Sequence, residues 1–529
     1  MRLLNRCLTL VSGLIFLASF SYAATVTGRV KGPDGAPFMG AFVVAQNAQN
    51  KMSVNVLSDK DGRYHIENLP AGKYSVRIRA IGYQSDPKND VSLSDNQNVS
   101  FDFSLQKGTV RWSDLSIYQG MQLLPKTAGE DVLFDNCFVC HAFQTRMASA
   151  ARDEEGWREG VQHMRESMDL GARFTDAKAD SVVKYLTSTF GPDSTKPKSP
   201  EDMPEYKSLV RPFSDQAMNI VYVEYDVTAS DAKGLPWSAA PDKDGNLWMP
   251  YYGDGNKVGR LNPKTAEVTF FPLPPEASAG VHSAIPVPDG TVWFTEFFQN
   301  KIVHLDPKTK EITEYADEGT VPGERASKHT IRMDPKGTLW MSGGPFSSFD
   351  PETKKFSDYS QVPSSYGLIV DPQGNKWFAV YTANGAIGRV DAKTGEISVW
   401  PTKSGPAQRL QVDSDGTVWF SSRRQRDNIG RFDPKTETFK TFPLPGPSPS
   451  SYALNIDRDH YVWYSSTNQD TIGRLDPKTG QVLEYPFPHS EGLMREFFYD
   501  SQGRMWYATP TNNRVGYFYL ADSSQAAKK

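Results

Sequence analysis

The chain has few cysteines, no concentrated block of basic residues, and no apolar run that is long enough to span a bilayer. Three cysteines occur among 529 residues, so the position of each is informative. The net charge of −4, without a basic patch, argues against nucleic acid or an anionic membrane surface as a partner. With 12% aromatics, 41 Gly and 37 Pro, the composition is typical of several domains built from short strands and turns.

The first segment, 1–23, has the organisation of a secretory signal peptide. Two arginines precede an apolar run from Leu8 to Phe20, and small residues stand at the cleavage-site spacing before Ala24. The apolar run is too short for a transmembrane helix. We therefore predict a periplasmic or secreted protein without a membrane span, from which Cys7 is removed with the signal peptide.

Residues 24–107 alternate apolar and polar residues in short runs separated by turn signals such as Gly-Pro-Asp-Gly at 32–35. This pattern predicts a small β-sandwich. The stretches TGRVKGPDGAPFMGAFV and SDKDGRYHIENLPAGKYSVRIRAIGY resemble the carboxypeptidase regulatory-like family, which has a prealbumin-like, carbohydrate-binding-like fold. The resemblance implies the fold, and it leaves open whether the domain is a docking module or binds a carbohydrate ligand.

Residues 112–191 have a different periodicity. Trp157, Val161, Met164 and Met168 recur at the spacing of one apolar helix face. A second helix is predicted to begin at Thr175-Asp176 and to end near Gly191-Pro192. We expect a small all-α domain here, followed by a linker over 192–212.

The two cysteines of the mature chain lie within this helical region. Cys137 and Cys140 are three residues apart, and His141 follows at once, which is the spacing of a c-type haem attachment site. Structural zinc would need about four ligands, and a thioredoxin-like pair would need a βαβ context. A plain disulfide would leave His141 unexplained. We therefore predict one covalent haem c, bound by Cys137, Cys140 and His141, with His141 as an iron ligand.

The order NCFVCHAFQTR, GWREGVQHMRESM and FTDAKADSVVKYLTSTFGP resembles a single-haem cytochrome c. That resemblance implies a second axial iron ligand in the middle stretch. Met164 fits the family's spacing, and Met168 lies one turn later on the same helix face, so both remain candidates. A thioether ligand raises the reduction potential relative to two histidines. The predicted role is electron transfer with a periplasmic redox partner protein.

The remainder, 213–522, repeats itself. A Gly three residues before a Trp recurs every 37 to 47 residues, with His460 replacing the Gly in one copy, and IGR followed by an Asp-Pro turn comes after most copies. Seven such units predict a seven-bladed β-propeller. The last unit stops one strand short, and IVYVEYDVT at 220–228 is predicted to complete it and close the ring. The fold class is thus multidomain and mainly β, with a sandwich, a small all-α cytochrome c domain and a propeller.

The stretch VHSAIPVPDGTVWFTE, followed by NKI and DPKT, resembles virginiamycin B lyase, also called streptogramin lyase. This resemblance implies elimination chemistry at the central opening with Mg²⁺, histidine and glutamate. His282 and Glu296 match the lyase spacing, and His329 begins the inner strand of the next unit, so these three are the candidate catalytic residues. Trp237, however, occupies the position of the lyase's other histidine.

The other equivalent positions predict a polar, aromatic and cationic mouth, made by Tyr366, Gln408-Arg409, Tyr452 and Met494-Arg495. Two functions remain in view. One is an exported haem protein that transfers electrons while its propeller binds a substrate or redox partner. The other is a Mg²⁺-dependent lyase with an accessory cytochrome. Because elimination is redox-neutral and needs no iron, a haem domain favours the first.

Overall fold

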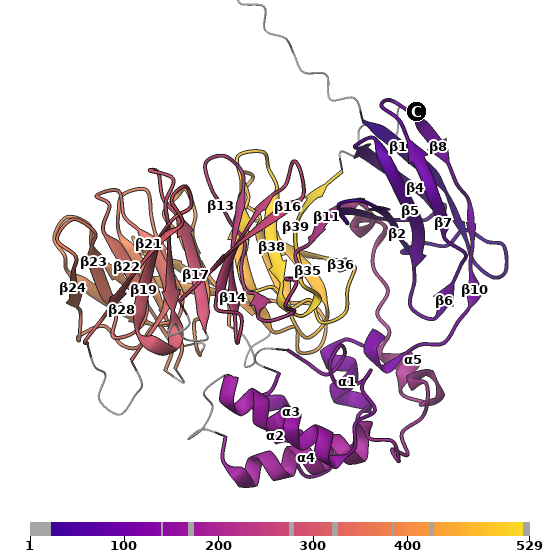
Figure 1. Cartoon of the computed structure of the whole chain (residues 1–529), viewed down its shortest axis with the longest axis horizontal. Helices are drawn as coiled ribbons and strands as arrows, with labels where there is room; N and C mark the ends of the chain where they lie inside the picture. Colours follow the sequence, from indigo (N-terminus) through magenta and orange to yellow (C-terminus); the bar gives the residue numbers. More distant parts are fainter. Residues whose placement is uncertain are drawn as a thin grey trace, which may run out of the picture.

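The computed structural model describes residues 23–138, 141–167, 174–274, 280–319, 326–382, 384–403, 405–422 and 428–521. The predicted signal peptide, 1–23, lies outside these residues except for Ala23. The described chain is multidomain and mainly β, with strands at the N-terminus, then helices, then a ring of sheets (Figure 1). None of the described helices is both long enough and apolar enough to cross a membrane.

The N-terminal part is a sandwich of short strands. In β4 (Arg63–Leu69) exposed and buried residues alternate at first, as expected for a strand with one face on the core. Strands β4, β1 and β8 form one sheet, while β3, β2, β5 and β7 lie side by side in another. The other strands of this part are β1 (Ala24–Lys31), β2 (Phe42–Asn47), β3 (Ser53–Leu57), β5 (Gly72–Arg79), β6 (Tyr83–Gln84), β7 (Lys88–Leu93), β8 (Asn98–Ser100), β9 (Phe103–Ser104) and β10 (Gln106–Lys107).

Helices follow the sandwich, as the periodicity predicts. The helix α4 (Asp176–Phe190) begins after Thr175, whose hydroxyl accepts a hydrogen bond from the amide of Lys178, and it ends at Gly191. Trp157 of α3 (Glu154–Ser167) is buried in the apolar core of this part. The other helices and 3-10 turns up to the propeller are η1 (Trp112–Asp114), α1 (Ile117–Leu123), α2 (Glu130–Asn136), η2 (Pro200–Asp202), α5 (Tyr206–Leu209) and η3 (Asp215–Asn219).

Among the described residues, the seven repeats form the seven blades of a propeller. The strands of blades 1 to 3 are β12 (Leu235–Pro236), β13 (Ala240–Pro241), β14 (Leu247–Tyr252), β15 (Lys257–Asn262) and β16 (Glu267–Pro272); β17 (Val281–Pro286), β18 (Val292–Glu296), β19 (Lys301–Asp306) and β20 (Glu311–Ala316); and β21 (Ser327–Met333), β22 (Leu339–Gly344), β23 (Ser347–Asp350) and β24 (Lys355–Asp358).

Blades 4 to 6 have the same antiparallel order, and blade 7 ends the chain. Their strands are β25 (Leu368–Val370), β26 (Lys376–Val380), β27 (Ala386–Val390) and β28 (Ile397–Pro401); β29 (Leu410–Val412), β30 (Val418–Phe420), β31 (Asn428–Asp433) and β32 (Thr438–Pro443); β33 (Ser451–Ile456), β34 (Val462–Ser466), β35 (Thr471–Leu475) and β36 (Val482–Pro486); and β37 (Phe498–Tyr499), β38 (Met505–Thr509) and β39 (Arg514–Leu520). The 3-10 turns η4 (Phe297–Gln299) and η5 (Pro510–Asn512) follow β18 and β38.

The strand β11 (Ile220–Asp226) lies between the propeller and the sandwich (Figure 1). Along one edge it pairs antiparallel with β39, so the predicted closure of the ring by this strand is confirmed. Along its other edge it pairs with β3, from Tyr222 opposite Asn55 to Glu224 opposite Ser53. One sheet therefore runs β37-β38-β39-β11-β3-β2-β5-β7, and the edge of the last blade is covered by the sandwich.

Five of the seven repeat tryptophans donate a hydrogen bond to an Asp six residues earlier, whereas Trp293 has Val287 at that position. The indole Nε1 of Trp377 donates to the Asp371 carboxylate at 2.9 Å. Trp419 lacks this bond, because Asp413 instead contacts Nδ1 of His460 in the next blade at 2.8 Å. His460 thus accounts for the one departure from the Gly pattern. The bond recurs at 2.7 to 3.1 Å in Trp248–Asp242, Trp340–Asp334, Trp463–Asp457 and Trp506–Asp500.

The IGR motif is explained by cross-strand pairs. Arg389 lies opposite Trp377, and its guanidinium carbon is 5.5 Å from the centre of the indole ring. Gly388 lies opposite Phe378, and a Cβ added to Gly388 would be 2.0 Å from Cζ of that ring. The Gly is therefore needed because the neighbouring aromatic ring occupies the space of a side chain.

Gly388→Ala should lower the stability of the propeller by about 1–3 kcal/mol, the usual cost of overpacking a core. The unfolding temperature measured by calorimetry checks this result. In a Phe378→Leu background the same substitution should cost clearly less, because the clashing ring is shortened. An equal loss in the two backgrounds would contradict this explanation of the motif.

Candidate functional site

Seven side chains, one from each blade, form a ring around the propeller axis, which we call the mouth ring. His282 and His329 stand near the starts of their inner strands β17 and β21, as predicted. Six of the seven are buried, and Tyr366 is partly exposed. The members, in blade order, are Trp237, His282, His329, Tyr366, Arg409, Tyr452 and Arg495.

Neighbouring members of the mouth ring touch one another. The ring centres of His282 and His329 are 4.0 Å apart, and those of His329 and Tyr366 are 3.9 Å apart. The hydroxyls of Tyr366 and Tyr452, on either side of Arg409 in the ring, form a hydrogen bond. The equal offsets in the repeat therefore translate into side chains that meet at one level of the channel.

Two arginines complete the mouth ring. The guanidinium carbon of Arg495 lies 3.6 Å from the ring centre of Trp237, and its Nη1 donates to the Tyr452 hydroxyl at 3.2 Å. Arg409 lies 5.2 Å from the ring centre of Tyr366. Its closest carboxylate is that of Glu496, at 3.7 Å. Glu496 also pairs with Arg332, so one carboxylate serves two arginines.

The surroundings of the two histidines of the mouth ring favour the neutral form. Burial lowers the pKa of His282 and of His329 well below the usual value, and the positive charges of Arg409 and Arg495 lower it further. Nδ1 of His282 lies 2.8 Å from the carbonyl oxygen of His329. Because a carbonyl only accepts, Nδ1 carries the hydrogen and Nε2 retains a lone pair. This Nε2 can accept a proton or bind a metal ion.

Glu296 ends β18 opposite Val281, so its backbone lies at the same end of blade 2 as His282. Its carboxylate is fully buried and has no hydrogen-bond partner among the described residues. Burial, together with the charge of Glu314, raises the pKa of Glu296 to about 7. The described residues show no contact between this carboxylate and either histidine, and no group of three or more His, Cys, Asp or Glu arranged to hold a metal ion.

The Cys-x-x-Cys-His segment lies at the end of α2. Cys137 follows that helix and is partly exposed, and His141 is buried. Nδ1 of His141 lies 3.0 Å from the carbonyl oxygen of Ala142, which fixes the hydrogen on Nδ1 and leaves Nε2 for a ligand. Cys140 lies outside the described residues.

The two candidate methionines have different outcomes. Met164 lies on α3 and is partly buried. Met168 lies outside the described residues, as do the five residues after it. The choice between them stays a prediction.

Glu491 of the propeller binds the backbone that follows His141. Its carboxylate accepts hydrogen bonds from the amide of Ala142 at 2.6 Å, from the amide of Thr145 at 2.9 Å and from the Thr145 hydroxyl at 2.6 Å. Glu491 is fully buried and has a φ of 62°, a conformation that costs a non-glycine residue of order 1–3 kcal/mol. These hydrogen bonds hold the propeller against the helical part.

The residues after Glu491 extend this contact to the mouth ring. We call Glu491–Glu496 the bridging segment. Leu493 is buried in the apolar core of the helical part, whereas Met494 is buried in a core of the propeller. Arg495 belongs to the mouth ring, and Glu496 pairs with Arg332 and Arg409. Six consecutive residues therefore contact both candidate sites.

Sequence reasoning did not find the bridging carboxylates. Glu491 and Glu496 lie in the connection between β36 and β37, where the repeat gives no register. Their partners are far away in the chain, such as Ala142 and Arg332. The one available signal was an acidic residue on each side of a short apolar pair in a loop, which by itself indicates nothing specific.

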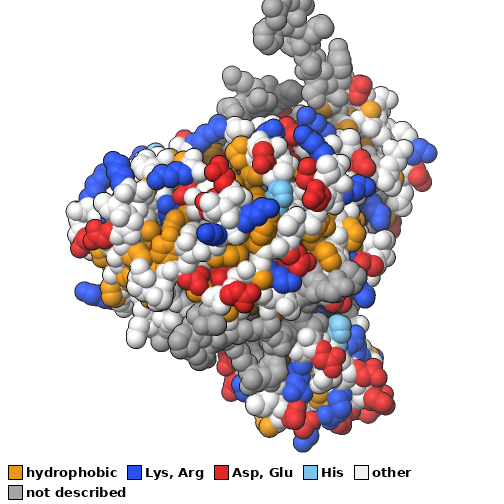
Figure 2. Space-filling view, turned by 60° about the vertical axis from the view of Figure 1, so that its left-hand side comes forward, with side chains coloured by type: hydrophobic (Ala, Val, Ile, Leu, Met, Phe, Trp, Pro, Cys, Tyr) orange, Lys and Arg blue, Asp and Glu red, His pale blue; other side chains and the backbone are white. Residues whose placement is uncertain are grey.

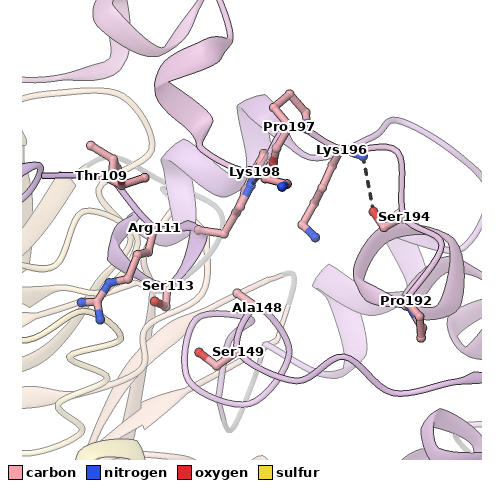
Figure 3. A pocket seen from close by; sticks show the side chains of 13 residues that line it. Thr109, Arg111, Ser113, Ala148, Ser149, Pro192, Ser194, Lys196, Pro197 and Lys198 are labelled. Atoms are coloured by element: carbon pink, nitrogen blue, oxygen red, sulfur yellow. Dashed lines mark hydrogen bonds between the residues drawn. The ribbon is translucent and has the colours of Figure 1, made fainter.

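A cavity of about 410 Å³ lies beside the helical part. Figure 3 shows Lys196, Pro197 and Lys198 of the linker on one side of it and Ala148 and Ser149 on another. None of the predicted site residues that the structure describes lines this cavity.

The outer surface shown in Figure 2 carries basic and acidic side chains interspersed over the propeller, in keeping with the low net charge.

The propeller is similar in fold to virginiamycin B lyase. The virginiamycin B lyase family model matches residues 352–525, and the carboxypeptidase regulatory-like domain model matches residues 25–106. The structure of virginiamycin B lyase from Staphylococcus aureus is 23% identical, with a TM-score of 0.50, over 57% of this chain and 100% of its own. A streptogramin B lyase structure is 22% identical, with a TM-score of 0.50, over 58% of this chain and 100% of its own. No curated protein sequence matches the chain.

Acid should destabilise the propeller through the mouth ring. The folded pKa of His329 lies well below its value in the unfolded chain. The contribution of neutral His329 to the free energy of unfolding is complete above about pH 6.5. That contribution is lost as the pH falls below this value, because only the unfolded chain takes up the proton. In His329→Gln, the free energy of unfolding should fall less steeply with acid, by about 1 kcal/mol per pH unit between pH 6.5 and 5.5.

Unfolding temperatures measured across this pH range for wild type and variant check the prediction. The matched control is His304→Gln on β19, which removes a histidine outside the mouth ring. Identical pH profiles for wild type and His329→Gln would show that the ring histidine is not protected from protons.

Proposed function

We propose that the protein is an exported c-type haem protein, in which the helical part transfers electrons and the propeller mouth binds an anionic substrate or a redox partner protein. The signal-like segment 1–23 supports export, and the Cys-x-x-Cys-His spacing supports covalent haem. The observation that carries the proposal is the bridging segment, Glu491–Glu496, which contacts the residues after His141 at one end and the mouth ring at the other.

The residues of the helical part fit a haem group. The hydrogen bond from Nδ1 of His141 to the Ala142 carbonyl leaves Nε2 free, which is how metal-binding histidines are commonly oriented. Phe138, Phe143 and Trp157 surround this region with buried apolar side chains. Cys137, Cys140 and His141 would hold the haem, and Met164 or Met168 would supply the second axial ligand. When bound, the haem would supply one-electron redox chemistry.

The mouth ring has the chemistry to hold an anionic group. Arg409 and Arg495 are buried, and the single carboxylate of Glu496 is shared with Arg332. Guanidinium groups bind carboxylate or phosphate oxygens well in such surroundings, so these two arginines are the candidates to hold an anionic ligand. The neutral Nε2 of His282 can accept a proton from a bound ligand.

The bridging segment keeps the two sites close. Arg495 is four residues from Glu491, so their backbones are at most about 14 Å apart even if fully extended. Glu491 is in turn bonded to the residue next to His141. A ligand in the propeller mouth would therefore lie near the proposed haem-binding segment. A short separation of this kind suits electron transfer between the ligand and the haem.

Covalent haem attachment is tested by changing both thiols. Wild-type protein matured in an oxidising compartment should keep its haem in acid–acetone and show the reduced α-band of a c-type cytochrome. Cys137→Ala combined with Cys140→Ala should release it, because both thioether bonds are lost. The matched control is Cys7→Ala, whose thiol leaves with the signal peptide. Haem that stays covalently bound in the double variant would overturn the assignment.

The second axial ligand is tested by single substitutions. Oxidised wild type should show a sulfur-to-iron charge-transfer band, and Met164→Ala should abolish it and lower the reduction potential. Met168→Ala serves as the matched comparison on the same predicted helix face. Loss of the band in Met168→Ala alone would assign the ligand to Met168, and retention in both would exclude a methionine ligand at either position.

A second candidate function is a Mg²⁺-dependent lyase. The family match over 352–525 and the stacked pair His282 and His329 favour it. A carboxylate would have to hold the metal ion, and Glu296 is the candidate. Ring opening of a streptogramin by the wild type with Mg²⁺, lost in His329→Ala, would establish this function. No turnover, with reduction of the haem by another bound compound, would support electron transfer.

A further inference from the structure

We propose that the pocket where the sandwich meets the last blade binds a small organic anion through the guanidinium groups of Arg77, Arg79 and Arg514. This junction pocket has a volume of about 600 Å³, which is within the range of ligand sites. Its walls come from β2, β3 and β5, from the connection around Thr109, and from propeller loops around His489 and Asn512. The proposal does not depend on the haem or on the mouth ring.

The continuous sheet brings these arginines together. Arg77 and Arg79 are two residues apart on β5 and so point to the same face. Through β2, Arg77 is in register with Asn55 of β3, which pairs with Tyr222 of β11. Arg514 begins β39, on the far side of β11. The joining of sandwich and propeller therefore creates the site, which neither part has alone.

Among the described residues, the arginines of the junction pocket form no direct ion pair, although the charges of Glu224, Asp114 and Asp470 act on Arg79 through space. The described carboxylates nearby are already engaged: Asp114 pairs with Arg111 at 2.7 Å, and Glu224 pairs with His489 at 2.7 Å. Glu224 also accepts hydrogen bonds from Asn55 and Tyr507 at 3.1 Å each. Among the described residues, no acid forms an ion pair with the three arginines of the proposed site.

Two further observations point to a missing anion. Nη1 of Arg514 is buried and has no hydrogen-bond partner among the described residues. Burial, and then the like charge of Arg514, lower the pKa of Arg77, while the charge of Glu224 raises it, so the repulsion between the two guanidinium groups is only partly offset. An oxyanion between them would satisfy the donor and relieve the repulsion.

The ligand class follows from the lining. A guanidinium fork matches the paired oxygens of a carboxylate or a phosphate, so the ligand carries one of these groups. The pocket is larger than a single oxyanion, and Ile81 and Tyr83 at its edge are 50% and 37% exposed, unusual values for large apolar side chains in this protein. These two side chains would cover the organic part of the ligand.

Titration calorimetry on the full mature chain at low ionic strength tests this site, with citrate as the carboxylate probe and inorganic phosphate as the phosphate probe. We expect one or both to bind, and Arg77→Ala and Arg79→Ala each to weaken binding at least tenfold. The matched control is Arg63→Ala on β4, an exposed arginine outside the pocket, which should bind like wild type. Binding by neither probe would overturn the proposal.

Arg77→Lys is the variant that separates loss of binding from misfolding, since it keeps the positive charge but loses the forked guanidinium group. It should unfold at the wild-type temperature and bind the probe several-fold more weakly. Wild-type affinity in both Arg77→Lys and Arg77→Ala would also overturn the proposal. Phosphate binding without citrate binding would assign the ligand to phosphorylated compounds, and the reverse result would assign it to carboxylates.

Discussion

Strand β11 is hydrogen-bonded along both of its edges, and the relative positions of sandwich and propeller depend on that pairing. Its pairing with β39 closes the propeller ring, because a strand that precedes the first repeat covers the open edge of the last blade. Its pairing with β3 attaches the sandwich in a fixed register. Glu224, in the middle of β11, is buried and bonded to Asn55, His489 and Tyr507. Through Glu224, the strand thus joins residues of the sandwich, of the connection between blades 6 and 7, and of blade 7.

The helical part is fixed by a different kind of contact. Glu491 uses a buried carboxylate and an unfavourable backbone conformation to bind the amides of Ala142 and Thr145. If the helical part moved away, the buried carboxylate of Glu491 would lose its hydrogen-bond donors, which is energetically costly. Glu491 therefore favours the docked position of the helical part. The same segment reaches the mouth ring at Arg495. The structure therefore joins the residues after His141 and the cationic propeller mouth in one continuous set of contacts.

The sequence predicted the features that repeat or are local. Seven Trp anchors and the strand at 220–228 predicted the closed propeller, and Thr175 predicted the start of a helix. Equal offsets placed His282 and His329 together. The surroundings of the Glu296 carboxylate, where burial and Glu314 raise its pKa and Lys301 lowers it, have no periodic signal. Contacts between domains, such as those of Glu491 and the junction arginines, join distant segments and could not be read from spacing.

The central claim is that the propeller holds and tunes a haem-binding segment through Glu491. Potentiometric titration of wild type and Glu491→Gln, both matured with haem, tests it most directly. The substitution removes a buried negative charge beside His141, which destabilises the ferric form, so the reduction potential should rise. Glu311→Gln, an exposed carboxylate on β20, is the control and should leave the potential unchanged. An equal potential in all three proteins, or a wild type that binds no haem, would contradict the claim.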